Sequence, residues 1–442
     1  MLSEKDKSLV CKCLQMALEA GASKARASLS KSSMDLVGTL DGGIDKVTSC
    51  QDSAISIAIF ADGRYGSFST NKLSEDSLKS FISRAVDTVK MLAADECRDL
   101  ADPSRTVKDA LTGDELKIHD AAYSGVSAED RVAAALNAAL KTRSGDGWKV
   151  VSEESEYSDS EYFNYIVDTN GLEALHSETS FDYWTEITIE AADGRKYSGS
   201  WWESAPMLAD FDCSQCGAKA LKMAVDQINP VEVESGKYNL VVDRDVASKL
   251  VSPILSALNA FSIQQGNSFL VDTLGKQVFP EGLTIMDCPR IEGQLGSKYF
   301  DSEGVATVQR PIIENGIVRE YFVNTYMANK LNIAPTQEDA TRPKLMPFGH
   351  NNLNEIMSFV GDGILVTEFN GGNSNSATGD FSYGIQGFRF KDGKIVHPVS
   401  EMLVTGNFIE LWGKLLAAGD DARPCMTKLI PTLAFADVDF SG

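Results

Sequence analysis

The chain lacks the features by which membrane and secreted proteins are recognised. Its 442 residues contain no run near the ~20 apolar residues that a membrane-spanning helix needs. The opening residues 1–7 are polar and charged, without the apolar stretch of a signal peptide. Eight cysteines are too few for a disulfide scaffold at this length. We therefore expect a cytoplasmic protein with reduced thiols and no membrane contact.

Basic residues are scarce as well. The chain has 41 Lys and Arg against 63 Asp and Glu, which gives a net charge of −22. Such an acidic surface repels the phosphates of nucleic acids and of anionic lipids. Direct binding to DNA or RNA is therefore not expected. The 43% of apolar and 24% of charged residues are ordinary for a soluble globular protein and exclude wholesale disorder.

The motifs of self-sufficient catalysis are missing too. The histidines are scattered, and none stands in a His-Glu-x-x-His pattern, which would place two imidazoles beside a carboxylate on one helical face. No Gly-x-Ser-x-Gly, Walker A or Gly-x-Gly-x-x-Gly stretch occurs. Cys213 and Cys216 form a lone Cys-x-x-Cys, whereas a zinc site would need a second pair. The four histidines are His119, His176, His350 and His397.

An order of elements occurs twice in the first half of the chain. Residues 1–105 and residues 106–230 each read as a helix, several antiparallel strands around an Ala-Asp-Gly-Arg hairpin turn, and a second helix. The shared order predicts an internal duplication. The expected strands are short, at 25–30, 34–40, 44–50 and 54–60 in the first region and at 149–154, 162–168, 172–176 and 184–191 in the second.

A third region follows the break at Asn229-Pro230. Residues 231–442 are mainly β in pattern, with Gly-rich turns. Residues 336–354 are polar and contain two prolines, which predicts a long loop, either functional or merely mobile. The fold class is therefore α+β, with two duplicated helix–antiparallel-strands–helix regions followed by a mainly β C-terminal domain. Helices in this domain are expected at 246–260, 325–331 and 407–417.

Four blocks of the third region carry a more specific signal. In their order and spacing they resemble the TldD/PmbA family, and most closely its PmbA (TldE) branch, whose members were once named modulators of DNA gyrase. The resemblance is strong after Asn229 and extends weakly over nearly the whole chain. The blocks are Asn267–Phe279, Phe300–Val305, Ala377–Gly384 and Pro398–Asn407.

The resemblance implies a cytoplasmic metalloprotease made of two related subunits. In that family the TldD subunit carries a His-Glu-x-x-x-His zinc motif on a helix early in the third region. The equivalent stretch here, residues 248–258, has no His and no Glu. The resemblance therefore implies no catalytic or metal-binding residue in this chain and zinc in a TldD-type partner. It also implies a cavity shared by two subunits, in which flexible peptides bind, for example as an added strand on a sheet edge.

Six residues of these blocks are candidates for the wall of such a cavity or for the dimer interface. A structural turn is the simpler role for the block around Asp380. One departure concerns the long loop, where PmbA-type sequences commonly carry a Thr-Gly-Asn-Ala-Gly-Gly-like stretch and this chain has Thr341 to Pro347 instead. The six candidates are Asp301, Gly304, Asp380, Phe381, Ser382 and Asn407.

Three functions stay open at this point. The first is a non-catalytic PmbA/TldE-like subunit that forms a heterodimer with a TldD-type metallopeptidase and helps it to bind flexible peptides. The second is a stand-alone peptide-binding or scaffold protein, as a homodimer without a proteolytic role. The third is a modulator of DNA gyrase acting through protein contacts, since the net charge of −22 disfavours contact with DNA.

Overall fold

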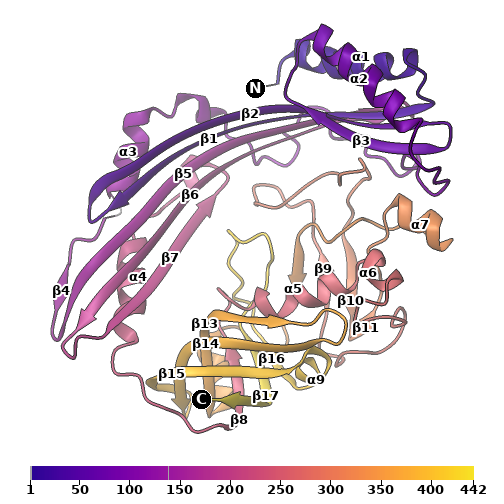
Figure 1. Ribbon diagram of the computed structural model, residues 1–442. Helices are drawn as coiled ribbons and strands as arrows, with labels where there is room; N and C mark the ends of the chain where they lie inside the picture. The colour runs from indigo at the N-terminus through magenta and orange to yellow at the C-terminus, as the bar shows by residue number, and fades with distance from the viewer. Residues whose placement is uncertain (1, 138) are drawn as a thin grey trace.

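The structure is a computed structural model that describes residues 2–137 and 139–442. It confirms the α+β class. A long curved sheet from the first half of the chain arches over a β-rich C-terminal half (Figure 1). None of the described helices is long and apolar enough to cross a bilayer.

The arch is one sheet to which both N-terminal regions contribute. Its strand order is β3-β2-β1-β5-β6-β7, with β4 beside β5. At its centre β1 and β5 run antiparallel over fifteen consecutive residue pairs, from Arg26 opposite Asp168 to Leu40 opposite Glu154. The boundaries at residues 105 and 230 stay predictions. The strands are β1 (Lys24–Leu40), β2 (Gly43–Ala61), β3 (Arg64–Thr70), β4 (Ser144–Gly145), β5 (Trp148–Asp168), β6 (Glu173–Ala191) and β7 (Lys196–Ala205).

The prediction of several short strands in each region was wrong. Residues 25–30 and 34–40 belong to one strand, β1, and the other predicted pairs merge in the same way into β2, β5 and β6. The polar residues between them do not interrupt pairing, because partners on other elements satisfy them. Lys31 forms an ion pair of 2.7 Å with Asp6, and the hydroxyls of Ser33 and Tyr123 lie 3.2 Å apart.

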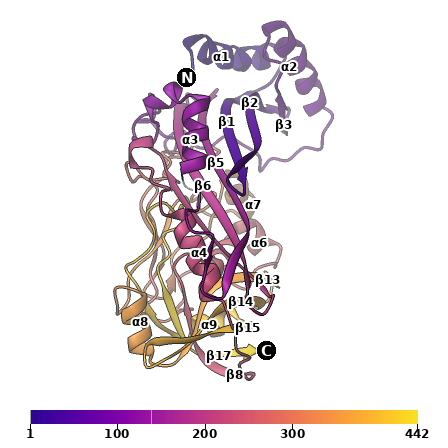
Figure 2. The ribbon, with the colours of Figure 1, turned by 90° about the vertical axis from the view of Figure 1, so that its left-hand side faces the viewer.

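The α-helices that the structure describes in the N-terminal half cover the same face of the arch. Odd-numbered side chains such as Leu29, Ile57 and Tyr157 are buried on that face, because successive side chains of a strand point to opposite faces. A Cβ on Gly199 of β7 would lie 2.4 Å from the carbonyl oxygen of Ala220, so the last helix packs directly on the backbone of β7. Figure 2 shows α3 and α4 lying over the strands. The helices are α1 (Glu4–Glu19), α2 (Glu75–Val89), α3 (Ala128–Asn137) and α4 (Cys216–Asp226).

The C-terminal half contains two sheets around a buried helix. Leu250, Val251 and Ile254 of α5 (Ser248–Ala257) are fully buried in the largest apolar core. The strand orders are β15-β14-β13-β8-β17-β16 and β11-β10-β9-β12. These strands are β8 (Gly236–Val242), β9 (Ile285–Asp287), β10 (Arg310–Glu314), β11 (Ile317–Val318), β12 (Pro343–Leu345), β13 (Gly363–Ser374), β14 (Asp380–Lys391), β15 (Lys394–Asn407), β16 (Leu415–Ala418) and β17 (Leu433–Ser441).

The helices expected in this half are found with different lengths. The helix expected at 325–331 is confirmed as α7 (Thr325–Leu331). The one at 246–260 stops earlier, because the extended backbone of Asn259 caps a separate helix, α6 (Ala260–Gln264). The one at 407–417 is only α9 (Phe408–Trp412), and β16 follows it. The loop expected at 336–354 contains β12, and α8 (Leu353–Val360) begins before its end.

Two stacked arginines fasten the arch to the C-terminal half. At one end, Arg98 lies 3.5 Å from the ring centroid of Tyr326 on α7 and 5.0 Å from that of Tyr65 on β3. At the other end, Arg423 stacks on Trp201 and Trp202 of β7, with ring-centroid distances of 4.6 and 4.5 Å. Such contacts combine apolar area with the attraction of a cation to an aromatic face.

Arg423 also connects the two halves through charge. Its guanidinium forms ion pairs with Glu203 of β7 at 3.0 Å and with Asp245 of the C-terminal half at 3.1 Å, and it donates to the backbone oxygen of Trp202 at 2.7 Å. The side chain is 7% exposed, so these bonds are made largely away from water. The planar fork of arginine is needed to make all three contacts together.

Replacement of Arg423 by Lys should therefore destabilise the protein although it keeps the positive charge. We expect Arg423→Lys to lower the free energy of unfolding by about 2 kcal/mol, because an ammonium cannot stack and bridge at once. Urea denaturation followed by tryptophan fluorescence measures this. The matched control is Arg319→Lys, whose pair with Glu314 is exposed and should change stability by less than about 0.5 kcal/mol. Equal effects of the two variants would contradict the role of Arg423.

Candidate functional site

The helix-free face of the arch and the C-terminal half enclose a cleft of about 640 Å³. We call it the central cleft. Even-numbered side chains of β5, β6 and β7 form its sheet wall, since odd-numbered ones point under the helices. The sheet wall consists of Ser160, Glu178, Ser180, Asp182, Trp202 and Ser204, and the opposite wall of Ser248, Leu295, Gly296, Lys298, Cys425, Met426, Thr427 and Lys428.

A second hollow of about 390 Å³ adjoins the central cleft, because Lys298 lines both. We call it the acidic hollow after Asp301, Glu338 and Asp339 on its C-terminal wall. Both volumes lie within the range of roughly 300–1,000 Å³ that is typical of ligand sites. The remaining lining residues are Tyr162, Asn164, His176, Phe300, Ser302, Ala340 and Thr341.

The sheet wall of the central cleft carries two carboxylates. Ser180 donates a hydrogen bond of 2.7 Å to Asp182, and Ser204 donates to its other carboxylate oxygen. Glu178 lies 3.1 Å from His176. Burial opposes the charged form of Glu178, but the hydrogen bond and charge of His176 and the charge of Lys298 outweigh it and hold the pKa of Glu178 below its ordinary value. The wall is therefore anionic at neutral pH.

The opposite wall carries two ammonium groups. Lys428 donates to the hydroxyl of Ser252 on α5 at 2.7 Å. Lys298 makes no side-chain hydrogen bond or ion pair with the residues that the structure describes, and its backbone oxygen accepts from Thr307 at 2.5 Å. Ser248 and Ser252 belong to residues 248–258, a stretch that contains neither His nor Glu. A hydroxyl-bearing stretch without His or Glu does not fit a zinc ion.

The acidic hollow is built around a turn at Asp301. The carboxylate of Asp301 accepts from the backbone N–H groups of Glu303 and Val305, each at 2.9 Å. Glu338 accepts from the backbone and hydroxyl of Ser302 at 2.7 and 2.6 Å. Burial raises the pKa of Asp301 to about 7, and the nearby charge of Glu338 adds to that effect.

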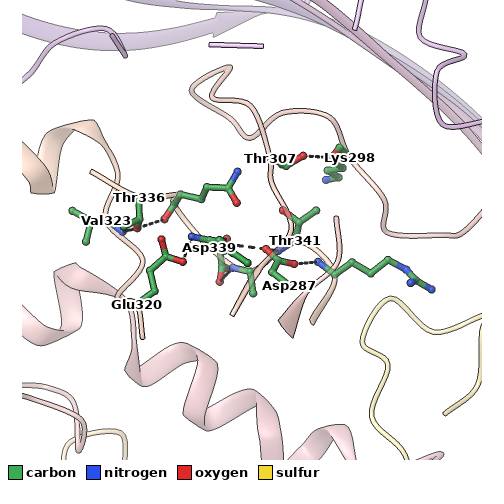
Figure 3. A network of polar contacts seen from close by, with 12 residues as sticks. Asp287, Lys298, Thr307, Glu320, Val323, Thr336, Asp339 and Thr341 are labelled. Atoms are coloured by element: carbon green, nitrogen blue, oxygen red, sulfur yellow. Dashed lines mark hydrogen bonds and ion pairs between the residues drawn. The ribbon is translucent and has the colours of Figure 1, made fainter. Parts of the chain in front are cut away.

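A buried polar network supports the hollow from below (Figure 3). Asp287 accepts from the backbone N–H groups of Thr341 at 3.0 Å and Arg342 at 2.7 Å, and the hydroxyl of Thr336 accepts from the N–H of Val323 at 2.9 Å. Arg310 joins Glu320 to the backbone oxygen of Asp339. The stretch from residue 336 to 342, expected to be loop, is thus held in place and lines the hollow.

The structure separates the six predicted site residues. Asp301 lines the acidic hollow, whereas Gly304 faces Leu172 of the arch. The other four lie around the start of β14 and the end of β15 and line neither hollow. Their role in a cavity or interface stays a prediction. In that group Asp380 accepts from Asn407 at 2.9 Å, Asn407 caps α9, Phe381 stacks on Phe408 with centroids 4.8 Å apart, and Ser382 is exposed.

The charged residues of the central cleft are not among the six that the sequence predicts. The available signal was weak, because even positions of β5 and β6 around Ser160 and Ser180 are mostly polar but odd positions there also include polar residues such as Asp159 and Thr179. That pattern marks a face without helices but does not reveal that Lys298 and Lys428 lie opposite it. Among the residues described, no three His, Cys, Asp or Glu side chains gather in a way that could hold a metal ion.

Comparisons with known proteins agree with this architecture. Models of the PmbA/TldA metallopeptidase family match residues 25–88 as domain 1, 122–228 as the central domain and 235–442 as the C-terminal domain. The metalloprotease PmbA of Escherichia coli is 26% identical over 98% of this chain and 97% of that protein. A PmbA homologue of Haemophilus influenzae is 27% identical over 92% of this chain and 90% of that protein.

Solved structures show the same likeness. A protein of Bacteroides thetaiotaomicron, described as a candidate modulator of DNA gyrase, is 38% identical with a TM-score of 0.93, and the alignment covers both chains completely. TldE from Thermococcus kodakarensis is 18% identical with a TM-score of 0.83 over 98% of this chain and 100% of that chain, which shows a shared fold.

An arched sheet over a β-rich domain, with a cleft between them, is thus the architecture of a known class of metallopeptidase-related proteins. The chain belongs to the PmbA/TldD metallopeptidase family. Two relatives that match it over 90% or more of both chains carry the name PmbA, the branch that the sequence resemblance indicated.

Gly304 offers a test of the contact between the turn and the arch. Gly304 and Gly194 share a φ of +80°, but a Cβ on Gly304 would lie 2.2 Å from the side chain of Leu172, while one on Gly194 meets nothing within 4 Å. Gly194→Ala should cost about 1–2 kcal/mol for the left-handed backbone alone. Gly304→Ala should cost about 1–3 kcal/mol more through overpacking. Equal losses in urea denaturation would contradict the contact.

The raised pKa of Asp301 predicts a pH-dependent stability. The carboxyl loses its proton near the ordinary 3.8 in the unfolded chain but near 7 in the folded one, so the free energy of unfolding falls as pH rises between these values. Asp301→Asn should therefore be more stable than the parent at pH 8, with the gain vanishing by pH 4. The urea midpoint at several pH values measures this. In Asp193, hydrogen bonds from Arg195 lower the pKa, so Asp193→Asn should show no gain at pH 8.

Proposed function

We propose that this chain is the non-catalytic subunit of a two-subunit cytoplasmic zinc metallopeptidase and that it helps a TldD-type partner to bind flexible peptides. One observation carries the proposal. The helix that would bear the zinc motif, α5, presents Ser248 to the central cleft and Ser252 to Lys428. Hydroxyls and an ammonium supply neither the ligands nor the general base that zinc hydrolysis needs.

The shape of the cleft supports a role in holding peptides. An extended peptide presents backbone donors and acceptors along its length, and the sheet wall offers hydroxyls and carboxylates at every second residue. Contacts to the backbone of the peptide do not depend on the side chains of the peptide, so they suit peptides of varied sequence. Relatives named metalloprotease make peptide hydrolysis the reaction in which such binding would be used.

A free strand edge supports assembly with a partner. β3 pairs with Ile55–Ala61 of β2, so residues 43–54 of β2 have no strand on their outer side among the residues described. Ile44 and Val47 on this edge are 51% and 67% exposed. An edge of this length with exposed apolar side chains favours an added strand, and we assign it to the partner subunit.

Reconstitution tests the proposal. The chain, a TldD-type subunit with an intact His-Glu-x-x-x-His motif, and the mixture are each assayed for bound zinc by mass spectrometry and for cleavage of an unfolded casein. We expect zinc only where the TldD-type subunit is present, cleavage in the mixture and none by this chain alone. The mixture made with the partner's motif Glu changed to Gln is the control and should be inactive.

Three outcomes would count against the proposal. Stoichiometric zinc together with cleavage by this chain alone would overturn the non-catalytic role. Peptide binding without association with any TldD-type subunit would favour a stand-alone scaffold. Association with gyrase and no effect on peptide cleavage would favour a modulator of gyrase, a role that the name of the Bacteroides thetaiotaomicron relative describes for that protein.

A further inference from the structure

The two walls of the central cleft carry opposite charges. Glu178 and Asp182 stand on the sheet wall, and Lys298 and Lys428 stand on the wall formed by the C-terminal half. On a protein with a net charge of −22, a wall with two ammonium groups and no carboxylate is a local exception. The sheet wall of the cleft is therefore negatively charged and the opposite wall positively charged.

Among the residues described, the charged groups of one wall form no ion pair with those of the other wall. Glu178 is paired with His176 on its own strand, and Asp182 accepts from two serine hydroxyls. Lys428 is bonded to a neutral hydroxyl, so it keeps two N–H donors for another partner. Lys298 is close enough to lower the pKa of Glu178, yet no ion pair between them is found among the residues described. A gap therefore separates the opposite charges.

A ligand that carries both charges would complete both walls. Glu178, Asp182 and Lys428 are partly buried, whereas Lys298 is exposed, and a partly buried charge is stabilised when a ligand supplies the opposite charge. The free ends of a peptide are such a pair of charges, an ammonium at one end and a carboxylate at the other. A cleft of about 640 Å³ has room for a molecule of small-ligand size, such as a peptide of a few residues.

We infer that the central cleft binds a short peptide with both ends unblocked, its α-ammonium at Asp182 and Glu178 and its α-carboxylate at Lys298 and Lys428. The inference rests on the proposed function in one respect, namely that peptides are the ligands of this site. It adds that the cleft recognises the charged ends and so selects peptides of a few residues, the size of a hydrolysis product.

Four versions of one ligand test this recognition. The purified full chain is titrated by calorimetry with trialanine, N-acetyl-trialanine, trialanine amide and the doubly blocked form. Trialanine should bind, and loss of either charge should weaken binding about tenfold or more, since a charge-assisted hydrogen bond contributes on the order of 1.5–3 kcal/mol. Equal affinity for all four peptides, or no binding of trialanine, would overturn the inference.

Single substitutions assign each end to its wall. Lys298→Met should discriminate less between trialanine and its amide than the parent does, because only Lys428 remains for the α-carboxylate, while it still discriminates against the acetylated peptide. Asp182→Asn should discriminate less between trialanine and the acetylated peptide while it still discriminates against the amide. Glu178→Gln serves the same purpose if Asp182→Asn does not fold. Lys79→Met, an exposed lysine on α2, is the matched control and should bind like the parent. Circular dichroism checks the fold of every variant.

The result can be separated from that of the reconstitution experiment. Cleavage of casein with the partner and no binding of trialanine would refute end recognition and leave the proposed function intact. Binding of trialanine with the expected pattern, together with no cleavage in the mixture, would support end recognition and refute the proposed function. If Lys298→Met bound all four peptides as the parent does, the assignment of the carboxylate to that wall would be wrong.

Discussion

The continuous pairing of β1 with β5 is the interaction on which the rest of the structure depends. Fifteen residue pairs without a bulge join the two N-terminal regions into one sheet and keep odd-numbered side chains of both on the same face. A shift by one residue would turn Leu29 and Tyr165 away from the helices and would place polar side chains beneath them. This register gives the arch one face for packing and leaves the other face polar.

The site follows from how the two halves meet. The arch contributes the carboxylates of Glu178 and Asp182, and loops of the C-terminal half contribute Lys298 and Lys428. Neither half has the complete set, so the cleft depends on the contacts that fix one half against the other. Arg98 and Arg423 are such contacts, and the turn at Asp301 is another, because its Gly304 fits against Leu172. Residues that do not themselves line the central cleft therefore determine its geometry.

Sequence reasoning succeeded where local pattern and structure coincide. The repeated element order, the helix at 325–331 and the β character of the third region all appear in the structure. It failed where long-range partners override local polarity. The stretch around Lys31 looked like a break between strands, but Asp6 of α1 neutralises the lysine within the sheet. Leu415 to Ala417 were expected to continue a helix, yet pairing with β17 makes them part of a strand.

The amino-acid sequence by itself determined the fold class, the family and the absence of His and Glu from residues 248–258, because these are properties of residue order that no packing can change. Only the tertiary structure decided which charges share a cleft. Glu178 and Lys428 are 250 positions apart in the chain, and no local pattern encodes a distance of that kind. Their proximity arises from the curvature of the sheet and from the contacts at its two ends.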